Sequence, residues 1–194
     1  MNVWVIGNGE SRRNFALNQI KDHTIGCNAV HRDYSCTEFV AVDRRMVNEI
    51  LRNEATQGRS VWTRPDWTKE YSLPRIKTLP DPPFTGTLKA DIPFHWNSGP
   101  YAVLLATTYN PRQIHLLGFD LYHTNNKVNN LYKDTENYNR SDTRPVPPDF
   151  WIYQLKKIFN YFNRIDFIQH QQSDWQIPTE WKDIKNLTIS YDIV

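Results

Sequence analysis

A short apolar run that leads directly into a glycine turn is the feature that most constrains the fold. Residues 3–6 read Val-Trp-Val-Ile, and residues 7–11 read Gly-Asn-Gly-Glu-Ser. A run of β-branched and aromatic residues of this length predicts a buried strand. Residues 11–20 then predict a helix, and residues 24–27 and 39–42 predict further strands. A strand, a helix and more strands in this order are typical of a parallel, doubly wound sheet.

The second half of the chain continues this alternation. Residues 98–109 predict a buried helix and residues 114–118 a strand. A further helix is expected after the prolines at positions 147 and 148, because the apolar residues that follow recur at helical spacing. Ser98 and Asp149 are the expected N-caps of the two helices. Residues 165–168 predict a last core strand, which completes an α/β, Rossmann-like, doubly wound fold with a mainly parallel sheet.

Two irregular segments interrupt the single domain predicted for residues 1–194. The segment at about 52–96 is an irregular insertion rich in proline and tryptophan, with residues 60–62 and 76–79 as candidate short strands. Residues 123–148 are polar and rich in asparagine, which predicts a mobile loop. Long irregular segments often act as lids or binding loops. For the insertion, the alternative is a surface excursion that its tryptophans hold against the core.

Composition excludes several classes of protein. Lys+Arg 23 against Asp+Glu 21 is too balanced for a nucleic-acid binder recognised by charge. No apolar run approaches the roughly 18 residues that span a bilayer, and no secretion signal is visible, so we expect a cytoplasmic protein. Cys27 and Cys36 are expected to be reduced, and no cysteine or histidine cluster has metal-ligand spacing. The oligomeric state stays open, with a homo-oligomer among the alternatives.

The glycine turn indicates an anion site. Backbone N–H groups in a strand-to-helix turn, with the positive end of a helix behind them, favour a nucleotide phosphate. NAD fits poorly, because Arg12 replaces the third glycine of the dinucleotide fingerprint. The second strand also ends in Cys27-Asn28 rather than in an acidic residue. The alternative is a tight turn that binds no ligand.

Two later segments add candidate ligand-binding residues. Asn97, Ser98 and Gly99 open the buried helix, where Asn97 and Ser98 are candidates to bind a carboxylate or a phosphate. Asp120 and Tyr122 directly follow a predicted parallel strand, and ligands bind at the carboxyl ends of such strands. A tyrosine there can donate a hydrogen bond to a departing oxyanion. No Asp-x-Asp pair is present to hold Mg²⁺, so we expect no metal and no cofactor.

Four segments in this order resemble the bacterial sialyltransferases of glycosyltransferase family 42. They are the turn at residues 7–11, the pair Cys27-Asn28, the Ser-Gly-Pro-Tyr segment at 98–101 and the Gly-Phe-Asp-Leu-Tyr segment at 118–122. The resemblance implies a metal-independent transferase that moves a sugar from a CMP-activated donor to a hydroxyl of a glycan or another acceptor. With the positions argued above, the expected nucleotide- and sugar-binding residues are Gly7, Asn8, Gly9, Ser11, Asn28, Asn97, Ser98, Gly99 and Asp120.

The resemblance also implies catalytic roles. Tyr122 and Tyr132 would stabilise the departing phosphate. The family's general base is a histidine in the loop after the tyrosine segment. In this chain the corresponding loop, residues 123–148, contains one histidine, His123. Carboxylate alternatives for the base are Glu136, Asp142 and Asp149. Two departures from the family stand out: Glu10 replaces a proline of the turn, and Asp43 stands near the position of a family asparagine.

Two other functions fit the same residues. One is a catalytically inactive nucleotide-binding module that keeps the pocket but has lost the base. The other is a related pyrophosphokinase that acts on a small heterocycle, which has a similar Gly-Asn-Gly turn but requires Mg²⁺ ligands that the sequence does not offer.

Overall fold

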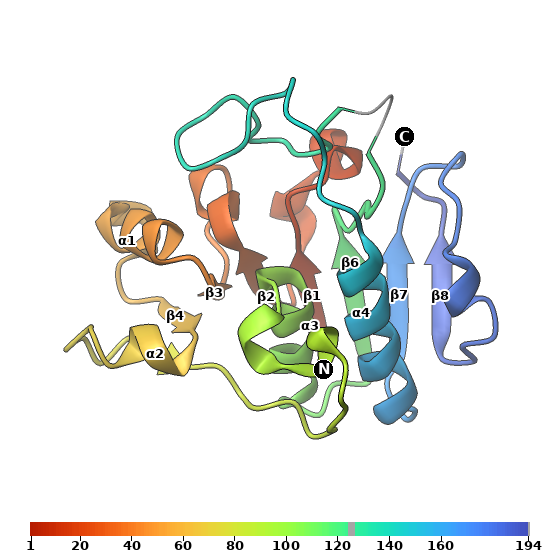
Figure 1. Cartoon of the computed structure of the whole chain (residues 1–194). Helices are drawn as coiled ribbons and strands as arrows, with labels where there is room; N and C mark the ends of the chain where they lie inside the picture. Colours follow the sequence, from red (N-terminus) through yellow and green to blue (C-terminus); the bar gives the residue numbers. More distant parts are fainter. Residues whose placement is uncertain (124–126, 194) are drawn as a thin grey trace.

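The strand order centres on β1, the strand that precedes the glycine turn. The computed structural model describes residues 1–123 and 127–193, and within them eight strands form one parallel sheet in the order β5-β4-β3-β2-β1-β6-β7-β8 (Figure 1). The strands are β1 (Asn2–Ile6), β2 (His23–Cys27), β3 (Glu38–Val40), β4 (Ser60–Thr63), β5 (Ile76–Thr78), β6 (Gln113–Leu117), β7 (Asp166–His170) and β8 (Leu187–Ser190). Because β1 pairs with both β2 and β6, the chain reverses its direction of winding between β1 and β6.

Helices cover both faces of the sheet. They are α1 (Arg44–Arg52), α2 (Pro65–Thr68), α3 (Ser98–Thr107) and α4 (Asp149–Tyr161), with the short 3-10 helices η1 (Glu10–Asn14), η2 (Leu17–Gln19), η3 (Asn28–Arg32), η4 (Glu54–Thr56), η5 (Lys89–Asp91), η6 (Pro93–His95) and η7 (Thr179–Trp181). Val3 and Val5 of β1 belong to the core formed with α3 and α4, whereas Ile6 belongs to the core formed with α1 and η3. This alternation along one strand confirms the predicted doubly wound α/β fold.

The helix α3 packs on β1 and β2 near the middle of the sheet and lies beside α4 (Figure 1). Every residue of α3 except Gly99 is buried, which explains why its sequence is apolar on all sides. The expected N-caps were displaced by one residue. Ser98 and Asp149 are the first residues of their helices, after Asn97 and Pro148. In α3 this frees the Ser98 hydroxyl for other contacts.

The predicted helix over residues 11–20 was wrong. The 3-10 helices η1 and η2 occupy this segment, and the extended backbone of Phe15 separates them. The extended conformation brings the Phe15 ring to 5.7 Å from the ring of Trp4 and 6.3 Å from that of His170. Packing of one aromatic ring on the sheet therefore replaces the regular helix.

The segment at 52–96 supplies two strands of the sheet, and they lie where residues 60–62 and 76–79 were predicted as candidate short strands. β4 pairs with β3, and β5 forms the edge beyond β4. Sequence reasoning also missed α1 and β8. The helix α1 carried recognisable signals, since Asp43 accepts a hydrogen bond from Arg45 N at 2.8 Å as N-cap, and the apolar side chains of α1 share one buried face.

A stack of aromatic rings lies on the sheet face opposite α3. Trp4 stacks on His115 with ring centres 4.2 Å apart, and His115 Nδ1 lies 2.9 Å from His170 Nε2. His170 Nδ1 in turn contacts the carboxylate of Asp192 at 2.9 Å. Burial, followed by the neighbouring His170, lowers the pKa of His115 from its usual 6.5 to about 4. The folded chain therefore keeps His115 neutral at pH values at which the unfolded chain protonates it.

This stack predicts a specific pH dependence of stability. Between pH 6.5 and about 4, the unfolded state binds more protons than the folded state. As the pH is lowered through this range, the contribution of His115 to the free energy of unfolding should therefore fall, and below about pH 4 it should level off. We expect His115→Asn to flatten the dependence of the melting temperature on pH there. The exposed His123 gives the control, His123→Asn, which should keep the wild-type slope. Parallel curves for wild type and His115→Asn would contradict the prediction.

Candidate functional site

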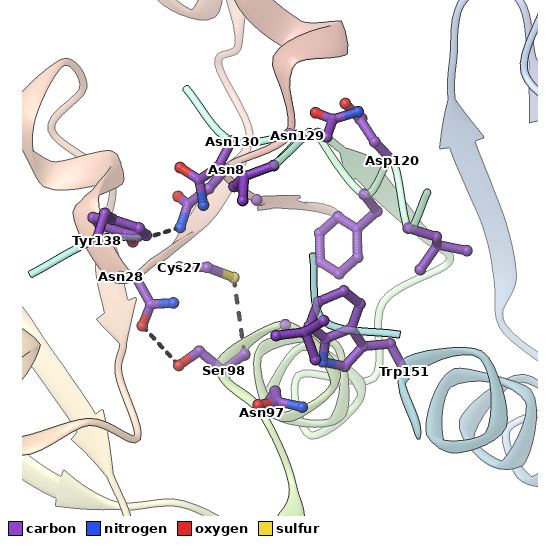
Figure 2. A pocket seen from close by; sticks show the side chains of 18 of the residues that line it. Asn8, Cys27, Asn28, Asn97, Ser98, Asp120, Asn129, Asn130, Tyr138 and Trp151 are labelled. Carbon is purple, nitrogen blue, oxygen red and sulfur yellow. Dashed lines mark hydrogen bonds between the residues drawn. The ribbon is translucent and has the colours of Figure 1, made fainter. Parts of the chain in front are cut away.

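A cavity of about 590 Å³ opens at the carboxyl ends of the strands, where the winding reverses (Figure 2). Ligands bind at this position in open α/β sheets. The walls come from the turns after β1, β2 and β6, from residues 42–46 after β3, from the N-terminal parts of α3 and α4, and from the loop between residues 128 and 146. The lining includes Gly7, Asn8, Gly9, Asn28, Asn97, Ser98, Gly99, Asp120, Tyr122 and His123, all predicted as site residues, but not Ser11 or Tyr132.

The turns after β1 and β6 pack directly against each other. Gly7 N donates to Leu117 O at 2.7 Å, and Gly9 N donates to Gly118 O at 2.9 Å. A β-carbon added at Gly7 would lie 2.5 Å from Gly118 O, and one at Gly9 would overlap the Asp120 carboxylate. The glycines of the turn therefore permit this close approach of two strand ends.

Asp120 fixes the two turns to each other. Its buried carboxylate accepts a hydrogen bond from Ser11 N at 2.9 Å and another from the Ser11 hydroxyl. Burial raises the pKa of Asp120, and the hydrogen bonds from Ser11 oppose that shift. Ser11 and Asp120 were both predicted to contact a ligand, but the structure pairs them with each other.

Four of the five N–H groups of the glycine turn already have acceptors within the protein, and among the described residues only that of Asn8 has none. Those of Gly7, Gly9, Glu10 and Ser11 donate, in that order, to Leu117 O, Gly118 O, Asn129 Oδ1 and Asp120 Oδ2. Moreover, the turn leads into a five-residue 3-10 helix rather than an α-helix. These amides therefore offer little to a phosphate, although the turn still forms one wall of the cavity.

The N-terminus of α3 offers free donors instead. Within residues 1–123 and 127–193, no acceptor contacts the N–H groups of Ser98 and Gly99. The Ser98 hydroxyl donates to Asn28 Oδ1 at 2.7 Å and accepts from Val42 N at 3.1 Å. Asn28 has a left-handed backbone (φ 51), which asparagine tolerates. Ser98 thus orients Asn28, whose amide nitrogen points into the cavity (Figure 2).

Tyr138 is a site residue that sequence reasoning missed. Its hydroxyl accepts hydrogen bonds from Asn8 Nδ2 at 2.8 Å and from Ala29 N at 3.4 Å. Asn8 Oδ1 is buried and has no partner among the described residues. Asparagine dominates this side of the cavity, which we call the amide wall: Asn8, Asn28, Asn97, Asn130, Asn137, Tyr138 and Asn139. Neutral amides both donate and accept, as the edge of a nucleobase and the hydroxyls of a sugar require.

Tyr132 points away from the cavity. Its hydroxyl donates to Asp33 Oδ1 at 2.7 Å and accepts from the Arg12 guanidinium, whose Nε donates to Gly7 O at 2.7 Å. Burial raises the pKa of Tyr132. Tyr132 and Arg12 therefore tie the loop to the glycine turn, and Arg12 lies beneath the cavity rather than at its mouth.

The loop predicted to be mobile has many contacts in its described part. Arg32 donates to Thr135 Oγ1 at 2.7 Å and to the carbonyl of Glu136 at 2.8 Å, and Leu131 N donates to Asn8 O at 2.8 Å. Residues 124–126, in the first part of that predicted loop, lie outside the described residues. The contacts of residues 131–138 place Tyr138 in the cavity, and a polar sequence gave no sign of them.

Tyr122 and His123 stand at the mouth of the cavity, where both are exposed. Burial of part of its ring raises the pKa of Tyr122, so the phenol stays protonated at neutral pH. Leu121, just before it, has a left-handed backbone (φ 63), which is strained for leucine. The carboxylates predicted as alternative bases, Glu136, Asp142 and Asp149, are not among the described lining residues. Asp43, which was not among them, does line the cavity.

Comparisons with models of protein families, with curated proteins and with solved structures give no match for this chain. Within the described residues, no group of three or more His, Cys, Asp or Glu side chains is placed to hold a metal ion. In the same part of the chain, no helix combines the length and the apolar character that crossing a membrane requires.

The pairing of Asp120 with Ser11 predicts a large effect on stability. Asp120→Ala leaves a buried N–H and a buried hydroxyl without acceptors, so we expect the free energy of unfolding to fall by at least about 1.5–3 kcal/mol. Urea denaturation measures this change. The exposed Asp183, which has no hydrogen bond to a described residue, gives the control: Asp183→Ala should change stability by less than about 0.5 kcal/mol. Equal losses in both variants would refute a role for the pairing.

Proposed function

We propose that this chain is a metal-independent glycosyltransferase of the sialyltransferase type, which transfers a sugar from a CMP-activated donor to an acceptor hydroxyl. One observation carries the proposal: at the reversal of the sheet, the amide wall and the free N-terminus of α3 face the same cavity, with Tyr122 and His123 at its mouth. The amide wall suits a nucleobase and a ribose, and the helix end suits an anion.

The charge of the cavity supports a donor with one phosphate. Arg45 is the only lysine or arginine among the described lining residues, which is little for a diphosphate. The described lining has two carboxylates, and both accept hydrogen bonds from the protein: Asp43 from Arg45 N, and Asp120 from Ser11 N and the Ser11 hydroxyl. They are therefore not arranged as a pair of Mg²⁺ ligands. The donor phosphate then lies against Ser98 N and Gly99 N.

The proposed reaction uses the two residues at the mouth. The acceptor oxygen attacks the anomeric carbon, a new C–O bond forms, and the bond between that carbon and the phosphate oxygen breaks. CMP leaves with the electron pair, and the Tyr122 hydroxyl donates a hydrogen bond to the departing oxygen. The proton of the acceptor hydroxyl passes to a base, for which His123 and Asp43 are the candidates.

The hydrogen bonding of Tyr132 and His123 favours a second function, that of an inactive nucleotide-binding module. Tyr132 is paired with Asp33 and Arg12, and His123 has no hydrogen bond to a described residue that would hold it in place. Such a module would bind CMP without turning over a CMP-sugar.

The experiment that tests the proposal measures release of CMP from CMP-sialic acid in the presence of EDTA. We expect turnover in the wild type, and a roughly 100- to 1000-fold lower rate in Tyr122→Phe, because the lost hydrogen bond strengthens only as the phosphate leaves. The affinity for CMP should change much less, since the hydroxyl adds little to ground-state binding.

Tyr191→Phe is the matched control, because Tyr191 is 53% exposed and does not line the cavity. Its rate should equal that of the wild type. Tight CMP binding without turnover would favour the inactive module over a transferase that hydrolyses its donor without an acceptor. A wild type that binds NAD but not CMP would refute both functions, and nucleotide binding that is lost with EDTA and restored by Mg²⁺ would favour the pyrophosphokinase.

A further inference from the structure

The cavity has a second side whose chemistry differs from that of the amide wall. We call it the apolar wall, and it consists of Phe119, Leu121, Pro145, Val146, Trp151 and Leu155. Trp151 lies across the cavity from Tyr138 and Asn28 (Figure 2). Phe119 and Leu155 are also part of the core behind it, so this side is supported from within the fold.

Trp151 is only half-buried because of its position on α4. The side chains of Ile152, Leu155 and Ile158 are buried against the sheet and α3, whereas that of Trp151 is only half-buried. Its indole N–H has no hydrogen bond to a described residue. By contrast, four other tryptophans of the chain donate from the indole, namely Trp62, Trp67, Trp175 and Trp181. The fold thus leaves both the edge and a face of Trp151 for contacts in the cavity.

The apolar character continues outward from the cavity. Val146 is 57% exposed, and Phe150, directly before Trp151, is 37% exposed. An aliphatic and an aromatic side chain exposed beside an apolar cavity wall favour contact with an apolar ligand. A site for a bare sugar would need hydrogen-bonding side chains to match its hydroxyls, and the six residues of this wall offer only one side-chain donor, the indole of Trp151.

We propose that the apolar wall is the subsite for an alkyl or aryl substituent of the acceptor alcohol. The substituent packs on the ring of Trp151 and contacts Leu121 and Val146, while the acceptor hydroxyl points toward the donor on the amide wall. This assignment rests on the proposed transferase function and names its second substrate class: an alcohol with an apolar group, such as an alkyl or aryl glycoside, rather than a free sugar.

The test compares the binding of phenyl and methyl β-glucoside by calorimetry, each with and without CMP. An aromatic contact with Trp151 should make the phenyl glycoside bind about 3- to 10-fold more tightly than the methyl glycoside. Trp151→Leu should abolish most of this preference and leave the affinity for CMP within about twofold. Tyr161→Leu is the matched control, because Tyr161 is an aromatic residue at the other end of α4 that is 53% exposed.

Equal affinity for the two glycosides in the wild type would overturn the proposal, and so would a phenyl preference that persists in Trp151→Leu. If Trp151→Leu fails to fold, Val146→Asn replaces it, since an exposed position tolerates the change and the phenyl preference should still fall. A Trp151-dependent phenyl preference in a protein that binds no CMP would keep the subsite and reject the nucleotide function, so the two failures are distinguishable.

Discussion

The hydrogen bonds from Ser11 to the carboxylate of Asp120 organise the region from which the cavity is built. They join the turns after β1 and β6, the two strands between which the winding reverses. The turns come this close only because Gly7 and Gly9 have no β-carbon. Arg12 and Tyr132 extend the same junction to the loop that carries Tyr138. The floor of the site therefore depends on hydrogen bonds within the protein, and of the residues that make them Ser11, Arg12 and Tyr132 do not line the cavity.

This junction decides where a charge can bind. The glycine turn uses four of its five N–H groups, all but that of Asn8, to hold protein acceptors, including the Asp120 carboxylate and the Asn129 amide. The N-terminus of α3 keeps its first N–H groups free, and the Ser98 hydroxyl orients Asn28 instead of capping the helix. We therefore expect the phosphate of a CMP-sugar to bind the free N–H groups at the N-terminus of α3. The amide wall lies beside this position, and the apolar wall lies across the cavity.

The sequence predicted the sheet well because a strand covered on both faces is rich in apolar residues, as in β1 and β6. It missed β8, whose residues are only half-buried and therefore carry a weak pattern. Candidate site residues at strand ends, such as Asn8 and Asn28, reached the cavity because parallel strands end at one edge. Tyr132 and Tyr138 share one loop, and only the long-range contacts of Arg12 and Arg32 decide which of them enters the cavity.

The most direct test of this account is an NMR titration with CMP that follows the backbone amides. The account predicts that the amide signals of Ser98 and Gly99 move most, because their N–H groups gain an acceptor. Those of Gly9, Glu10 and Ser11 should move little, because their N–H groups already have acceptors. Large shifts at residues 9–11 with an unchanged α3 would contradict it and return the phosphate to the glycine turn.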